Sequence, residues 1–128
     1  MRATIIALAT TIWLASTAHA DVRRAAIPES FWGKWAASAD DCGKADVPSV
    51  VLSAKQYVSA ERKCAVGWVI ETPGSQASFY SAHLECAAAG TPSSKAVSDV
   101  ILRQNDANQI SIGTDFNALK SFQRCTPQ

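Results

Sequence analysis

The sequence predicts an all-β fold: a small antiparallel up-and-down meander that closes into a barrel of seven to eight strands with two disulfides. Short runs of alternating apolar and polar residues follow one another, separated by turns rich in Pro, Gly, Asn and Asp. Four cysteines stand at wide spacing, which is typical of disulfides in an exported protein. The hydrophobic fraction of 48% is enough for one packed core.

The first twenty residues are predicted to be a secretory signal peptide. Arg2 gives a positive start, residues 5–15 are apolar, and residues 18–20 have the small-x-small pattern that signal peptidase recognises. Cleavage after Ala20 would place the mature protein in the periplasm or the medium. The apolar stretch is shorter than the roughly 20 residues that a membrane span needs, so no span is expected after cleavage.

Residues 21–30 are expected to form an extended lead-in, and residues 31–128 a single β-barrel domain. The predicted strands cover residues 31–36, 50–53, 56–59, 64–71, 77–87, 96–104, 109–113 and 119–125. A helix over residues 94–103 remains open beside the strand there, because Val97, Val100 and Ile101 would share one helical face.

One predicted hairpin, formed by residues 64–71 and 77–87, can be given a register. When Cys64 is placed opposite Cys86, the inner face receives a continuous set of mostly apolar residues: Cys64, Val66, Trp68 and Ile70 opposite Cys86, Leu84, Ala82 and Tyr80. The outer face then receives His83 and Glu85, and Phe79 opposite Glu71. A shift of one strand by one residue would bury His83 and Glu85, so this register is preferred.

The register predicts a disulfide between Cys64 and Cys86, and the remaining pair is then Cys42 with Cys125. The second bond would tie the loop after the first strand to the last strand, as expected where these two strands become neighbours in a closed barrel. A zinc site is disfavoured, because close C-x-x-C pairs are absent.

The first strand contains Gly33-x-Trp35, preceded by Phe31, and Arg124 stands just before Cys125. This combination resembles the lipocalin and calycin barrels, in which the Trp closes one barrel end and the Arg packs across its ring. A guanidinium over an indole gains a cation–π attraction. The resemblance therefore implies that Trp35 and Arg124 form a structural pair at one barrel end.

Lipocalins are longer than this chain and usually carry a C-terminal helix. The mature chain looks more like small bacterial barrels of this type. One such group is the periplasmic metalloprotease inhibitors, which share a signal peptide, an early Gly-x-Trp and a disulfide. This resemblance implies that the protein inhibits another exported protein.

No catalytic, cofactor or metal site is predicted, so the protein is not expected to be an enzyme. His83 is the single histidine left after signal cleavage, and residues 40–46 lack the alternating oxygen ligands of a calcium loop. The formal net charge of +1 falls to zero when Arg2 is removed. A nucleic-acid-binding protein usually carries a basic surplus, so this class is excluded.

Three aromatic residues, Trp32, Phe79 and Phe116, are candidate contacts for a partner protein, because they are expected to point outward or to lie in loops. Trp35, Trp68 and Tyr80 are assigned to the core. The preferred function is an exported binding protein, in one form an inhibitor, whose partner is another exported protein. A carrier of a small apolar ligand is the weaker alternative, because large inward side chains would fill the barrel. A structural or stress-related envelope role also stays open.

Overall fold

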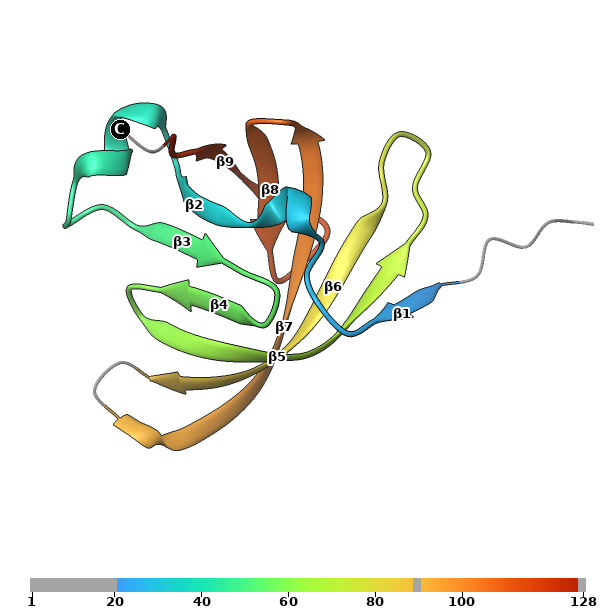
Figure 1. Cartoon of the computed structure of the whole chain (residues 1–128), viewed down its shortest axis with the longest axis horizontal. Helices are drawn as coiled ribbons and strands as arrows, with labels where there is room; N and C mark the ends of the chain where they lie inside the picture. The colour runs from blue at the N-terminus through green and yellow to red at the C-terminus, as the bar shows by residue number, and fades with distance from the viewer. Residues whose placement is uncertain (1–20, 89–90, 127–128) are drawn as a thin grey trace, which may run out of the picture.

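The alternating sequence folds into nine antiparallel strands (Figure 1). The computed structural model describes residues 21–88 and 91–126. The strands are β1 (Val22–Arg24), β2 (Gly33–Ala36), β3 (Ser49–Leu52), β4 (Gln56–Ser59), β5 (Arg62–Thr72), β6 (Phe79–Ala88), β7 (Thr91–Asp106), β8 (Gln109–Gly113) and β9 (Lys120–Arg124), with short 3₁₀ turns η1 (Glu29–Phe31) and η2 (Ala39–Gly43). The predicted signal peptide, residues 1–20, lies outside the described residues.

Strands β2 to β9 form a closed antiparallel barrel of eight strands. Each strand pairs with its neighbour in sequence, and β9 pairs with β2 to close the ring. The predicted all-β meander and the two disulfides, Cys42–Cys125 and Cys64–Cys86, are confirmed. The open helical alternative over residues 94–103 is wrong, because this segment lies within β7 and pairs with both β6 and β8.

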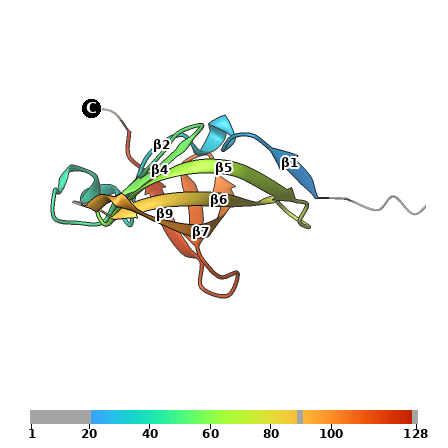
Figure 2. The ribbon, with the colours of Figure 1, turned by 90° about the horizontal axis from the view of Figure 1, so that it is seen from below.

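The expected lead-in is part of the barrel domain and is not extended throughout. Strand β1 pairs with the second half of β5, beyond the part of β5 that β4 covers (Figure 2). The chain then buries Ile27, whose side chain is 1% exposed, and turns into η1. The first strand was predicted to begin at Phe31. Phe31 instead ends η1, and β2 begins at Gly33.

The predicted register of β5 against β6 holds for the first part of the hairpin only. Cys64 faces Cys86 and Val66 faces Leu84, but the register shifts between Val66 and Trp68. A β-bulge of this kind adds one residue to one strand and reverses which side chains point inward beyond it. Gly67, the inserted residue, has no side chain that either face must accommodate.

The bulge corrects the expected position of Trp68. Trp68 now faces His83 on the outside of the barrel, and Val69, which is fully buried, faces the fully buried Ala82 inside. Ile70 faces Ser81 and is also displaced from its expected inward position. Tyr80, assigned to the core, is only partly buried and packs against the core cluster.

The barrel interior is filled by side chains. The largest fully buried residues come from six of the strands, from η1 and from the segment before it: Trp35, Phe31, Ile27, Leu52, Leu84, Leu102, Ile110, Val69, Val100 and Cys64. The Cys64–Cys86 disulfide also lies inside, with Cys64 1% and Cys86 5% exposed. Small eight-stranded barrels are just wide enough for such side chains to fill them.

Candidate functional site

The two residues that the resemblance singled out, Trp35 and Arg124, are in contact where β9 pairs with β2. The guanidinium carbon of Arg124 lies 4.3 Å from the ring centroid of Trp35, and the two residues are register partners across β9 and β2. Trp35 is fully buried, and its indole N–H donates to the carbonyl of Phe31 at 2.8 Å. The pair therefore joins the last strand, the first barrel strand and η1.

The nitrogens of Arg124 are bound to backbone carbonyls. Its Nε donates to Ala107 at 3.1 Å, Nη1 to Trp32 at 2.8 Å and Nη2 to Ser30 at 2.9 Å. Charge-assisted hydrogen bonds in a forked geometry fix position as well as adding energy. Because each of its nitrogens holds the main chain, Arg124 is a structural residue and is poorly placed to bind a ligand.

The position next to the Arg124 guanidinium requires a glycine, Gly33. Its φ is +124°, and a Cβ added there would lie 3.2 Å from Nη1 of Arg124. A residue with a side chain would be strained in this backbone conformation and would press on the guanidinium. The spacing in Gly33-x-Trp35 thus has a physical cause: the glycine makes room for the arginine that covers the tryptophan.

Trp32, one of the three candidate partner contacts, is 39% exposed. Its indole N–H donates to the carbonyl of Ile27 at 2.9 Å, so the polar edge of the ring helps to hold the lead-in. The rest of the ring remains at the surface beside η1. Its role is therefore at least partly structural.

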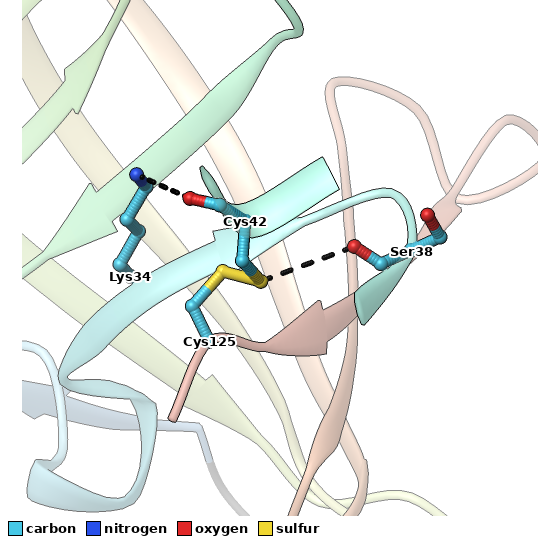
Figure 3. Close-up of a disulfide and its surroundings, with 4 residues drawn as sticks. All are labelled: Lys34, Ser38, Cys42 and Cys125. Atoms are coloured by element: carbon cyan, nitrogen blue, oxygen red, sulfur yellow. Dashed lines mark hydrogen bonds between the residues drawn. A yellow bond between two sulfur atoms is a disulfide. The ribbon is translucent and has the colours of Figure 1, made fainter. Parts of the chain in front are cut away.

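The Cys42–Cys125 disulfide ties η2 to the end of β9 (Figure 3). The Lys34 ammonium donates to the carbonyl of Cys42 at 2.9 Å, and Sγ of Cys42 lies 3.9 Å from the carbonyl oxygen of Ser38. Both cysteines are half-buried. An open groove of about 570 Å³ runs beside the bond and is lined by Gly33, Lys34, Cys42, Gly43, Arg124, Cys125 and Thr126.

The other two candidate contacts, Phe79 and Phe116, meet on the outer surface of the barrel. Their ring centroids are 5.2 Å apart at an interplanar angle of 76°, an edge-to-face arrangement. Phe116, in the loop between β8 and β9, is 59% exposed, whereas Phe79 on β6 is half-buried. Two residues far apart in the sequence thus form one aromatic surface.

Arg103 completes this surface. Its guanidinium carbon lies 5.6 Å from the ring centroid of Phe79, its register partner across β6 and β7. We call Phe79, Arg103 and Phe116 the outer patch. A pocket of about 320 Å³ adjoins it and is lined by Ser75, Gln76, Ala77, Phe79, Arg103, Gln104 and Asn105. Arg103 could not be singled out from the sequence, because an arginine in an alternating strand is ordinary for an exposed face.

A second stack lies on the outer face across β1, β5, β6 and β7. The Arg23 guanidinium carbon is 4.6 Å from the Trp68 ring, Trp68 stacks on His83 at 3.8 Å, and Nδ1 of His83 lies 3.1 Å from a carboxylate oxygen of Asp99. The stack holds β1 against the barrel. It was missed because Trp68 was expected inside.

At the end of β5, three side chains tie β1 to β6. Glu71 accepts from Arg24 at 2.5 Å and from the Tyr80 hydroxyl at 3.2 Å. The hydrogen bond from Arg24 lowers the pKa of Glu71, while burial and the nearby Glu71 charge raise the pKa of Tyr80. Tyr80 also packs edge-to-face on Phe31, with ring centroids 5.3 Å apart.

Among residues 21–88 and 91–126, no group of three or more His, Cys, Asp or Glu side chains is placed to hold a metal ion. None of the helices in the same described ranges is long and apolar enough to cross a membrane. Comparisons of the chain with protein-family models, curated protein sequences and solved structures give no match.

Proposed function

We propose that this small β-barrel is an exported binding protein that docks another exported protein through the outer patch. The observation that carries the proposal is the edge-to-face contact of Phe79 with Phe116, together with the Arg103 guanidinium over the Phe79 ring. Aromatic and arginine side chains dominate the binding energy of protein interfaces. Phe116 is the second most exposed of the large hydrophobic residues found at the surface of the described chain, after Val97.

The filled interior supports binding outside the barrel. Trp35, Phe31 and Leu84 are fully buried in the core, and the buried Cys64–Cys86 bond joins β5 to β6. A carrier of an apolar ligand would need that space. The two disulfides also make the barrel rigid, and a rigid surface loses little conformational entropy when a partner docks.

The two disulfides indicate an oxidising, extracytoplasmic location. Export by a signal peptide cleaved after Ala20 is part of the proposal. So is membership among the small lipocalin-like barrels, which the Gly33, Trp35 and Arg124 arrangement supports. In its narrowest form, the proposal is inhibition of an exported enzyme by docking, without catalysis by the barrel itself.

The test is capture of exported proteins from the native host by the tagged mature protein and by two variants. Phe79→Ala combined with Phe116→Ala removes the two rings of the outer patch, and Val97→Ala removes an apolar side chain on β7 that is 68% exposed. We expect the double variant to lose about tenfold or more of the captured partner, while Val97→Ala retains it. Circular dichroism of all three proteins is the control for folding.

Equal capture by the double variant and the native protein would contradict the proposal. A small molecule that copurifies with the mature protein, and is released only on denaturation, would contradict it as well. That second result would favour the carrier function.

A further inference from the structure

We propose that the pocket beside Arg103 binds a carboxylate side chain, Asp or Glu, of the partner protein. This inference rests on the proposed function and names the chemistry that the outer patch recognises. It follows from three features of the pocket: the charge of its lining, the position of the guanidinium, and an aromatic wall.

The lining carries one charge. Of the seven residues around the pocket, Arg103 has a charged side chain and the other six have uncharged ones: Ser75, Gln76, Ala77, Phe79, Gln104 and Asn105. The ion pairs of the described residues join other side chains, and none involves Arg103. The pocket is therefore electropositive and lacks an internal counter-charge, which an anionic group of a partner would supply.

The Arg103 guanidinium is held in place by a hydrogen bond at its Nε. Its Nε donates to Oδ1 of Asn105 at 3.3 Å, and the Asn105 amide donates to Oγ of Ser111 at 2.9 Å. Ser111 is 6% exposed, so this network is anchored in the barrel wall. With Nε used in this way, the two terminal nitrogens, Nη1 and Nη2, have no hydrogen bond to the described residues. They remain as a pair of parallel donors.

Two parallel N–H donors match the two oxygens of a carboxylate. This distinguishes Arg103 from Arg124, whose three nitrogens all hold backbone carbonyls. It also distinguishes Arg103 from Arg24, which is paired with Glu71. Among these three arginines, Arg103 is the one that is both positioned by the fold and free to bind an anion.

The wall formed by Phe79 suits the carbon chain of an acidic side chain. The ring is half-buried and lines the same pocket, with its centroid 5.6 Å from the guanidinium carbon. Methylene groups of an entering Glu can therefore pack on the ring while its oxygens reach Nη1 and Nη2. The volume of about 320 Å³ is at the lower end of the range for ligand sites, about 300–1,000 Å³. It fits one or two side chains better than a large cofactor.

The test is a titration followed by NMR on the mature protein, with resonances assigned for the backbone and for the Arg103 Nε–H. The probe is N-acetyl-glutamate N-methylamide, and the matched neutral probe is the corresponding glutamine derivative. We expect the glutamate probe to shift the signals of Arg103, Gln76 and Phe79 in a saturable way. The glutamine probe should bind at least about tenfold more weakly, because it lacks the charge-assisted hydrogen bonds.

Variants separate this pocket from general attraction of anions to the surface. Arg103→Met should abolish the saturable shifts, and Arg103→Lys should weaken binding, because an ammonium lacks the planar fork. Lys63→Met removes an exposed cation on β5 outside the pocket and should leave binding unchanged. Shifts that survive Arg103→Met, or equal shifts by the two probes, would overturn the proposal.

A third probe, inorganic phosphate at equal ionic strength, tests the choice of anion. If phosphate saturates the pocket as tightly as the glutamate probe, the assignment to a carboxylate is overturned. Failure of this inference is distinguishable from failure of the proposed function. In the first case the carboxylate probe does not bind although Phe79→Ala with Phe116→Ala still abolishes capture. In the second, capture is unaffected by those substitutions whatever the probe does.

Discussion

Arg124 and Trp35 are register partners at the seam where β9 closes the barrel onto β2, and the Arg124 guanidinium lies 4.3 Å from the indole ring. The same guanidinium holds three backbone carbonyls, two of them at or next to η1. One side chain therefore covers the core, joins the ends of the meander and fixes the turn that precedes the first barrel strand. Removal of the Arg124 side chain should therefore lower the stability of the fold.

Replacing Arg124 by Met should lower the free energy of unfolding by about 2–3 kcal/mol. The substitution removes the cation–π contact with Trp35 and three charge-assisted hydrogen bonds, partly compensated by water at this half-buried site. Urea denaturation measures the change. Lys120→Met, which removes an exposed cation from the same strand, should change stability by less than about 0.5 kcal/mol. Equal effects of the two substitutions would contradict this structural role.

Gly33→Ala should destabilise the protein by about 1–3 kcal/mol, because an alanine would adopt φ +124° under strain and its Cβ would lie 3.2 Å from Nη1 of Arg124. Gly43→Ala is the matched control, since a Cβ there meets no atom within 4 Å and φ is not positive. Thermal unfolding of both variants measures the difference. If Gly33→Ala unfolds at the same temperature as Gly43→Ala, the prediction that a side chain at position 33 is strained against Arg124 is contradicted.

The two disulfides should be reduced in order. Cys64 and Cys86 are 1% and 5% exposed inside the barrel, whereas Cys42 and Cys125 are half-buried beside an open groove. A thiol reductant should therefore open Cys42–Cys125 first. Graded reduction followed by alkylation and peptide mass mapping gives the order, and early labelling of Cys64 would contradict it.

Loss of the Cys42–Cys125 bond should also lower the free energy of unfolding more than loss of the other disulfide, because it returns more conformational entropy to the unfolded chain. It closes a loop with a sequence separation of 83 residues, against 22 for Cys64–Cys86. In the chain-entropy model the Cys42–Cys125 bond stabilises the folded protein by about 4–5 kcal/mol and the Cys64–Cys86 bond by about 3 kcal/mol. Denaturation of the protein with Cys42 and Cys125 both replaced by Ser measures the larger value. A change below about 1 kcal/mol would contradict the estimate.

Stability should fall at both ends of the pH range. The pKa of Glu71 is held below its ordinary value of 4.5 by Arg24, so its contribution is present above that pH and is lost as the pH falls through the lower folded value. The pKa of Tyr80 is raised above 10.0, so its contribution is present below pH 10 and is lost as the pH rises through the higher folded value. The measurement is the free energy of unfolding as a function of pH. In Glu71→Gln it should depend less on pH on the acid side, and in Tyr80→Phe it should depend less on pH on the alkaline side. Unchanged curves would contradict the pairing.

Local patterns in the sequence were enough to predict the eight barrel strands and both disulfides, but not β1. Period-two alternation and turn residues are set within a few residues, and Cys64 opposite Cys86 follows from them. The bulge at Gly67 could not be predicted in the same way. Trp68, Val69 and Ile70 are all apolar, so alternation allows either phase, and the choice depends on which side chain fits the core across from Ala82.

The outer patch could be predicted only in part. Phe79 and Phe116 were candidates because each was expected at the surface, but nothing in the sequence brings a residue of β6 next to the loop that follows β8. Arg103 gains its position from Asn105, two residues along β7, which is held in turn by Ser111 on β8. The bond to Ser111 depends on the register of β7 against β8, which no local pattern encodes.

The most direct test of the central claim, that the outer patch docks another exported protein, is site-specific photo-crosslinking in cells that export the protein. A benzophenone amino acid replaces Phe116 in one variant and Val97 in the other, so that both probes sit at exposed apolar positions. We predict that light produces a discrete protein adduct from position 116 and none from position 97. Absence of an adduct at position 116, or the same adducts from both positions, would contradict the claim.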